Sequence, residues 1–262
     1  MSGSPRLVLL AADADGLVAR LVHAAGVFGQ ASMPPWALVG GMAVMVQLAE
    51  AHRATADVDT VADDDGGQLE PALAVLAAEH HGLATGTRVV LEDGTKIDVI
   101  TTGSWVAEDL PDDDLDRIFV LAHWWAVQTA EVVELRVVDG PEIATAAEIT
   151  VATPAALVAC KLQSCRRRQR DQAKAASDIY DIYRLLAEHD RDGRVATTLA
   201  AGPADLGRWC ADALTKTFVT DAGRSTRRLG TAARGPAMAA IRAIDLEVVG
   251  ALCSDAIRDA LT

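Results

Sequence analysis

Two aspartates stand one residue apart in the stretch RATADVDTV, which begins at residue 53. A β-strand here would place Asp57 and Asp59 side by side, because side chains two positions apart on a strand share a face. Two carboxylates held this close repel each other, which favours a positive charge between them. That charge is either a Lys or Arg partner or a divalent cation, whose preferred ligands are carboxylate oxygens. A solvated strand end beside the acidic turn DDDGG is the plain alternative.

Two more features of the first half bear on this choice. The segment WALV predicts a short strand that runs directly into Gly40 and Gly41, and the apolar stretch after them predicts a helix. The segment TRVVLEDGTKIDVI predicts a hairpin that turns at its Asp-Gly pair and carries Asp98 on its second strand. Asp98 is therefore a third candidate ligand or an ordinary edge residue. The glycine pair taken alone is a turn.

The elements that must position these residues change in type along the chain. Up to residue 152 predicted strands alternate with helices, and two short strands, VVELRVV and EITVA, end this part. Thr153 and Pro154 suit an N-cap and the first turn of a helix, and the rest of the chain is mostly helical in period. We predict an α+β protein with a mixed sheet and flanking helices in domain 1–152 and a mainly helical domain 153–262.

Composition limits the class of protein. Of the 262 residues 50% are hydrophobic, which is enough for one large core or two smaller ones and argues against disorder. The apolar run LVLLAA is too short to span a membrane or to form a signal peptide, so we expect a cytoplasmic protein without membrane contact. The four cysteines form no CxxC pair and no cluster with histidine, which predicts buried or idle thiols.

The formal net charge of −13 is unevenly distributed. Residues 1–150 hold 7 Lys and Arg against 24 Asp and Glu, whereas residues 151–262 hold 17 against 13. An acidic half suits cation binding and a mildly basic half suits a polyanionic partner. The alternative is an acidic solvated surface beside a near-neutral helical region.

Together these segments resemble the nucleotidyltransferase fold of the DNA polymerase β superfamily. Within it, LVGGMAVMVQL followed by RATADVDTV looks like the Gly-Gly-x-Ala and Arg-x-Thr-x-Asp-hydrophobic-Asp segments of the AbiEii-type toxins, which include the mycobacterial MenT nucleotidyltransferases. The later stretch KLQSCRRRQRDQAKAASDIYDIYRLL is similar to that family's succession of a lysine, arginines and an Asp-x-x-Asp helix.

The resemblance implies roles in the first half. Gly40 and Gly41 would let the backbone approach a nucleoside triphosphate (NTP) at a helix N-terminus. Asp57, Asp59 and Asp98 would hold Mg²⁺ or Mn²⁺ ions that polarise an attacking hydroxyl.

The same resemblance implies roles for five further residues. Arg53 and Thr55 would brace the acid strand, Lys161 would contact the triphosphate, and Asp178 would complete the active site from the helical half. Lys174, one helical turn earlier, is the candidate substitute for a lysine that the family often carries just before Asp178.

Each residue of the helical half also has a plain alternative. Lys161 would be an exposed, solubilising lysine, and Asp178 with Asp181, at i,i+3 on one helix face, would belong to a salt-bridged surface. A cluster of guanidinium groups suits RNA phosphates but also a solvated helix end; it comprises Arg166, Arg167, Arg168 and Arg170.

The activity implied by the resemblance is metal-dependent transfer of a nucleoside monophosphate (NMP) from an NTP to a hydroxyl acceptor. The family implies that this acceptor is the 3′ end of tRNA and that the protein is the toxin of a toxin–antitoxin pair with a possible cognate antitoxin. Two alternatives stay open: a small-molecule acceptor, as in antibiotic nucleotidyltransferases, and a catalytically inactive binding module.

Overall fold

The chain divides into two compact units in the computed structural model. The first comprises Met1–Glu108 and Ala126–Thr153, and the second comprises Asp109–Trp125 and Pro154–Thr262. The structure describes residues 4–262 except for residues 14, 32, 65, 104–109, 169–170 and 234.

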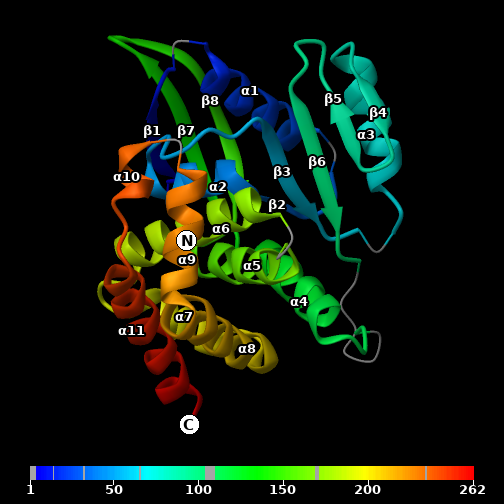
Figure 1. Ribbon diagram of the computed structural model, residues 1–262. Helices are drawn as coiled ribbons and strands as arrows, with labels where there is room; N and C mark the ends of the chain where they lie inside the picture. The colour runs from blue at the N-terminus through cyan, green and yellow to red at the C-terminus, as the bar shows by residue number, and fades with distance from the viewer. Residues whose placement is uncertain are drawn as a thin grey trace. The chain divides into compact units, whose positions relative to one another are not determined.

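An eight-stranded mixed sheet forms the first unit (Figure 1). Its strands are β1 (Arg6–Ala11), β2 (Trp36–Val39), β3 (Asp57–Ala62), β4 (Leu83–Thr85), β5 (Arg88–Val90), β6 (Lys96–Thr101), β7 (Glu131–Asp139) and β8 (Glu142–Val151). They follow the order β1-β7-β8-β2-β3-β6-β5-β4 across the sheet. The pairs β1–β7, β8–β2 and β3–β6 are parallel and the other pairs are antiparallel.

Three helices accompany this sheet: α1 (Leu17–Gln30), α2 (Gly40–Leu48) and α3 (Leu69–Glu79). Helix α1 packs against β8, where a Cβ at Gly26 would lie 2.7 Å from the Cβ of Ala147. A larger side chain at either position would push the helix away from the sheet. The small residues in β8 therefore allow α1 to approach the sheet closely.

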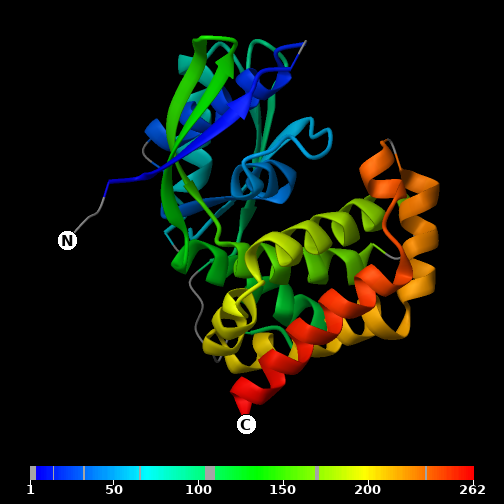
Figure 2. The same cartoon turned by 90° about the vertical axis from the view of Figure 1, so that its left-hand side faces the viewer.

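The second unit is helical (Figure 2). Its elements are α4 (Asp114–Gln128, whose last residues continue into the first unit), α5 (Pro154–Arg167), α6 (Gln172–His189), α7 (Arg194–Ala201), α8 (Ala204–Leu214), the π-helix η2 (Thr215–Thr220), α9 (Ala222–Ala232), α10 (Pro236–Ala239) and α11 (Ala243–Leu261). Helices α5 and α6 pack together, and α11 packs along α7, α8 and η2. Buried aliphatic side chains of these helices form a core within the unit.

The predicted α+β class, with a mixed sheet, flanking helices and a mainly helical C-terminal half, is confirmed. The hairpin predicted around Asp98 is β5–β6, and α5 begins at Pro154 as the sequence indicated. The strand predicted over VVELRVV is confirmed as β7, which is one residue longer at each end, whereas the strand predicted over EITVA is too short, because β8 begins at Glu142. They form one long hairpin, β7–β8, of 9 and 10 residues.

Two expectations from composition concern thiols and membranes. All four cysteines are free and buried, as predicted. Burial raises the pKa of Cys160 and of Cys165 to about 12, so both thiols stay protonated at neutral pH. Over the described residues, every helix is too short or too polar to cross a lipid bilayer.

Candidate metal and nucleotide site

Three carboxylates of the first unit meet on neighbouring strands. Asp57 and Asp59 lie on β3 and Asp98 lies on β6, with Asp59 directly beside Asp98 in the parallel register. One oxygen from each side chain lies within 4.8 Å of the others, and all three residues are partly buried. At such distances the three anions repel one another strongly. This donor set of carboxylate oxygens matches what Mg²⁺ and Mn²⁺ bind, so the residues present fit a divalent cation.

A positive partner for one of these acids comes from β5. Arg88 pairs with Asp98 across the antiparallel β5–β6 ladder. Its Nε donates to Asp98 Oδ1, and its Nη2 donates to Asp98 Oδ2 at 2.9 Å. The hydrogen bond and charge of Asp98, with a smaller contribution from the charge of Asp57, raise the pKa of Arg88. The acid cluster thus has both a built-in arginine and the donor set for a cation.

The glycine pair lies against the same strand. Gly40, the first residue of α2, has φ +69°, a value that glycine adopts without strain. A Cβ at Gly40 would collide with the carboxylate of Asp59. The absence of a side chain therefore lets the start of α2 touch the acid strand, where free backbone N–H groups and the helix dipole favour anions.

Arg53 and Thr55 lie beside the second glycine. A Cβ at Gly41 would stand 2.7 Å from Arg53 Nη2 and 3.0 Å from Thr55 Oγ1. The first unit therefore brings together all seven of its predicted site residues: Gly40, Gly41, Arg53, Thr55, Asp57, Asp59 and Asp98.

The predicted site residues of the second unit form an ion network of their own. Lys161 Nζ on α5 lies 2.8 Å from Asp181 Oδ2 and 3.2 Å from Asp178 Oδ1 on α6. Arg168 Nη1 lies 3.4 Å from the other oxygen of Asp178. The side chains of Lys161, Asp178 and Asp181 are 9%, 2% and 0% exposed. Neither an exposed lysine nor a salt-bridged surface describes these residues, because the network is buried.

Lys174 differs from this network. It lies exposed in the first turn of α6, where its backbone N–H donates to the N-cap Asp171 Oδ1 at 3.1 Å. Within the described residues its ammonium group makes no ion pair. Its role as a substitute for the family's lysine stays a prediction.

The members of the arginine run have different environments. Arg167 pairs with Asp116 at 3.0 Å and lies over the ring of Phe119, Arg168 joins the buried network, and Arg166 lines a pocket. Arg170 lies outside the described residues. The three described members of the run therefore do not share one environment, and the binding of RNA phosphates by this cluster stays a prediction.

Comparison with known proteins connects these observations to a family. A family model described as Nucleotidyl transferase AbiEii toxin, Type IV TA system, matches residues 28–205. The match spans more than half of the chain. This protein belongs to the AbiEii family of nucleotidyltransferase toxins. The matched region includes every predicted site residue of both units, from Gly40 to Asp178. A search of curated proteins finds no significant match.

Sequence reasoning missed Arg88. A two-residue turn at the Asp-Gly pair would place Arg88 opposite Val99, whereas the observed register pairs Val90 with Lys96 and so places Arg88 opposite Asp98. One extra residue in the loop decides which side chain faces the acid. The predicted hairpin included Arg88, but the sequence did not show the register of its two strands.

Proposed function

We propose that this AbiEii-family protein transfers an NMP from an NTP to the 3′ end of tRNA, with Mg²⁺ or Mn²⁺ held by Asp57, Asp59 and Asp98. The observation that carries the proposal is the meeting of these three carboxylates beside Gly40, at the start of α2. The family supplies the reaction class. A divalent cation bound there supplies charge stabilisation at the attacking and leaving oxygens.

The chain's own residues contribute binding and orientation. Gly40 and Gly41 present the N-terminus of α2, whose N–H groups suit triphosphate oxygens. Arg53, packed against Gly41, adds a positive charge for the same anion. Arg88 holds Asp98 through two hydrogen bonds and thereby orients it toward the other acids.

The roles of the helical unit are part of the same proposal. Lys161 is proposed to contact the triphosphate and Asp178 to complete the active site, while the buried ion pairs fix the positions of both groups within their unit. We further propose that the protein is cytoplasmic and that a cognate antitoxin counters it, as the toxin–antitoxin class of the family suggests.

The experiment that tests this function supplies the purified protein with Mg²⁺ or Mn²⁺, total tRNA and each α-labelled NTP in turn. Transfer of label to tRNA, lost when the metal is chelated, is the expected result. If label moves only to a small molecule, that molecule and not tRNA is the acceptor. No transfer to any acceptor, from a folded protein with all four NTPs, would favour the inactive binding module.

A further inference from the structure

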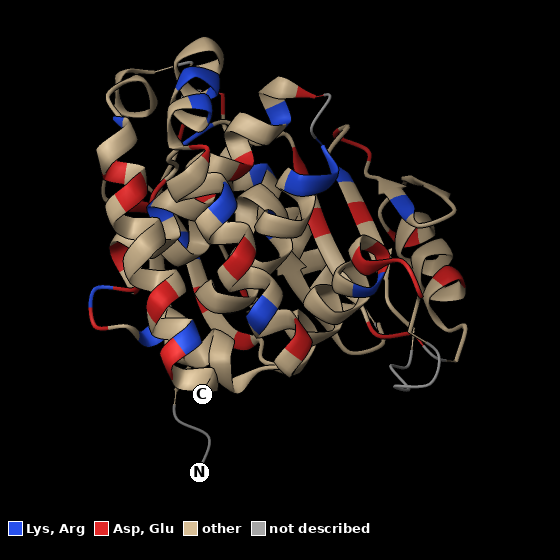
Figure 3. Cartoon of the chain, turned by 60° about the horizontal axis from the view of Figure 1, so that its bottom comes forward, with Lys and Arg blue, Asp and Glu red and all other residues tan. Residues whose placement is uncertain are grey.

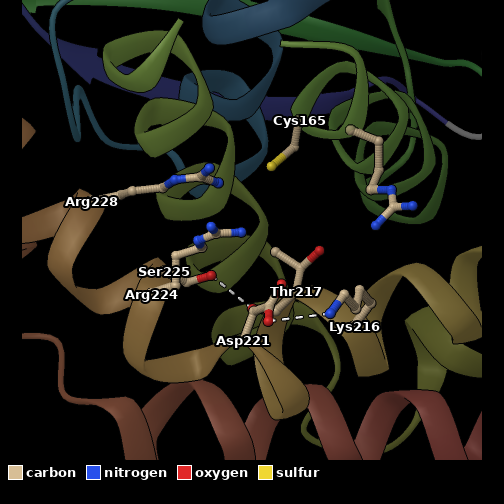
Figure 4. A pocket seen from close by; sticks show the side chains of 8 residues that line it. Cys165, Lys216, Thr217, Asp221, Arg224, Ser225 and Arg228 are labelled. Carbon is tan, nitrogen blue, oxygen red and sulfur yellow. Dashed lines mark hydrogen bonds and ion pairs between the residues drawn. The ribbon is translucent and has the colours of Figure 1, made fainter. Parts of the chain in front are cut away.

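A basic pocket of about 290 Å³ lies within the helical unit (Figure 4). It opens between the end of α5, η2 and the first turns of α9. Its lining residues are Cys165, Arg166, Lys216, Thr217, Asp221, Arg224, Ser225 and Arg228. Figure 4 shows Arg224 and Arg228 extending from α9 with their guanidinium groups on the side of the pocket where Cys165 lies.

The charges of this pocket do not balance. Four cationic side chains face one carboxylate, Asp221, whose Oδ1 lies 3.2 Å from Lys216 Nζ. Across the described part of the chain, no ion pair neutralises Arg166, Arg224 or Arg228. Three unneutralised guanidinium groups around one hollow form a strong site for an anion with several oxygens, such as a phosphate.

This excess of positive charge is local. The second unit as a whole holds 18 Lys and Arg against 18 Asp and Glu, and both signs are interspersed along its helices (Figure 3). The first unit holds 6 against 19. A general basic character therefore does not explain the pocket, which is a feature of three adjoining elements.

One wall of the pocket is a π-helix. Lys216 and Thr217 belong to η2, and Ser225 Oγ on α9 donates to the Thr217 carbonyl at 2.7 Å. Short π-helical stretches are uncommon and occur frequently at functional sites. The hydrogen bond joins η2 to α9 and so keeps Lys216 near the arginines of α9.

A second pocket of about 230 Å³ adjoins the first. It shares Arg166 and Lys216 with the basic pocket, and Trp209, Asp212 and Ala213 complete it. Trp209 is partly exposed on α8. An indole beside a cationic pocket is the combination that binds a nucleotide of a single strand, with the base stacked on the ring and the phosphate held by the cations.

We propose that these two pockets bind one nucleotide of the acceptor RNA, its phosphate between Arg166, Arg224 and Arg228 and its base against Trp209. The inference rests on the proposed function, because it concerns the RNA to which the NMP is transferred. It adds a binding site that is formed by the helical unit alone.

The test measures binding of labelled tRNA without NTP or metal, so that the readout does not depend on catalysis. The double variant R224Q/R228Q is expected to bind tRNA about tenfold more weakly and to reduce the salt slope of binding by about 1 to 2. The matched control R191Q/R194Q removes two exposed arginines of the same unit outside the pocket and is expected to bind like the wild type.

Tryptophan variants test the base-binding half separately. W209A is expected to weaken binding about tenfold with an unchanged salt slope, because stacking is lost and no charge is removed. W209F, which keeps an aromatic ring, is expected to restore most of the affinity. Equal losses in R224Q/R228Q and in R191Q/R194Q, or W209A binding like the wild type, would overturn the proposal.

Failure of this inference is distinguishable from failure of the proposed function. If wild-type protein labels tRNA while R224Q/R228Q retains full tRNA affinity, the pocket assignment is wrong and the activity stands. If R224Q/R228Q loses affinity for NTP and not for tRNA, the pocket serves the NTP phosphates and the assignment is overturned. If wild-type protein neither binds nor labels tRNA, both fail.

Discussion

The carboxylates of Asp57, Asp59 and Asp98 are partly exposed, whereas those of Asp178 and Asp181 are buried around one ammonium group. Water screens part of the repulsion in the first set and Arg88 pairs with Asp98, so this unit folds with three acids close together. A buried carboxylate has no such screening and needs a countercharge within the fold. The second set therefore has its cation buried with it, while the first, although Arg88 pairs with Asp98, keeps partly exposed oxygens accessible to a cation from solution.

The two clusters of acids should therefore respond differently to substitution. Removal of an acid from the first set should affect activity and leave stability nearly unchanged. Removal of the cation from the second set should affect stability first.

The largest effect is expected from D59A in the acid cluster. It removes a proposed metal ligand, which should lower NMP transfer about a thousandfold or more, since metal stabilisation of the transition state is worth several kcal/mol. Stability should not fall, because one of three repelling charges is gone. Steady-state transfer rates and urea unfolding measure the two effects.

A matched control for D59A is D139N, at the exposed end of β7 in the same unit. It should leave both measures unchanged. Full activity of D59A with unchanged metal dependence would remove Asp59 from the active site.

The second prediction concerns the buried ion network. K161M leaves Asp178 and Asp181 buried without their ammonium partner, which should lower the free energy of unfolding by about 3–5 kcal/mol. Adding D178N and D181N to K161M should recover part of this loss, because the uncompensated charges are removed. The exposed control K174M should change stability by less than about 0.5 kcal/mol. An unchanged urea midpoint for K161M would show that the network is not required for folding.

A third prediction uses a buried titratable group of the helical unit. Burial lowers the pKa of His123 from 6.5 to about 4, although its Nδ1 lies 2.8 Å from the Phe119 carbonyl oxygen. Between pH 6.5 and 4 the unfolded chain binds a proton that the folded state does not, so stability should fall as the pH falls through this window. The full change is about 3 kcal/mol.

Urea unfolding at several pH values measures this dependence. H123Q should show a flatter profile between pH 6.5 and 4, whereas H81N, at an exposed position of the first unit, should keep the wild-type slope. Parallel profiles for H123Q and the wild type would contradict the assignment of His123 as a neutral, buried group.

The first-unit site was largely predictable because its signals are local. Alternation places Asp57 and Asp59 on one face, and Gly40 follows a strand directly. The length of β8 was not predictable, because its three alanines carry a weak strand signal. The close packing of Ala147 on Gly26 in α1 explains why a small residue stands there. Tertiary packing overrides local preference there.

The second-unit network was less predictable for the same reason. The spacing of Asp178 and Asp181 indicates a shared helix face, but the burial of that face depends on which helix packs on it. Only the pairing of α5 with α6 brings Lys161 between the two acids. In the sequence Lys161 is only a lysine near several arginines, and nothing there indicates that its ammonium group lies buried between two acids.

Arg88 gives the most specific test of the comparison, because it holds one acid of the exposed cluster, Asp98, with two hydrogen bonds. If it positions Asp98, R88Q should lower the kcat of transfer about tenfold, a typical effect of losing a group that orients a metal ligand. Loss of a positive charge beside three carboxylates should at the same time lower the Mg²⁺ concentration needed for half-maximal activity.

R88K keeps the charge and loses the forked geometry, so it should lower kcat while leaving that Mg²⁺ concentration near the wild-type value. Wild-type kcat and Mg²⁺ dependence in both variants would mean that Arg88 is only a neutralising partner of a strand-edge acid, and Asp98 would then lose its place in the proposed metal site.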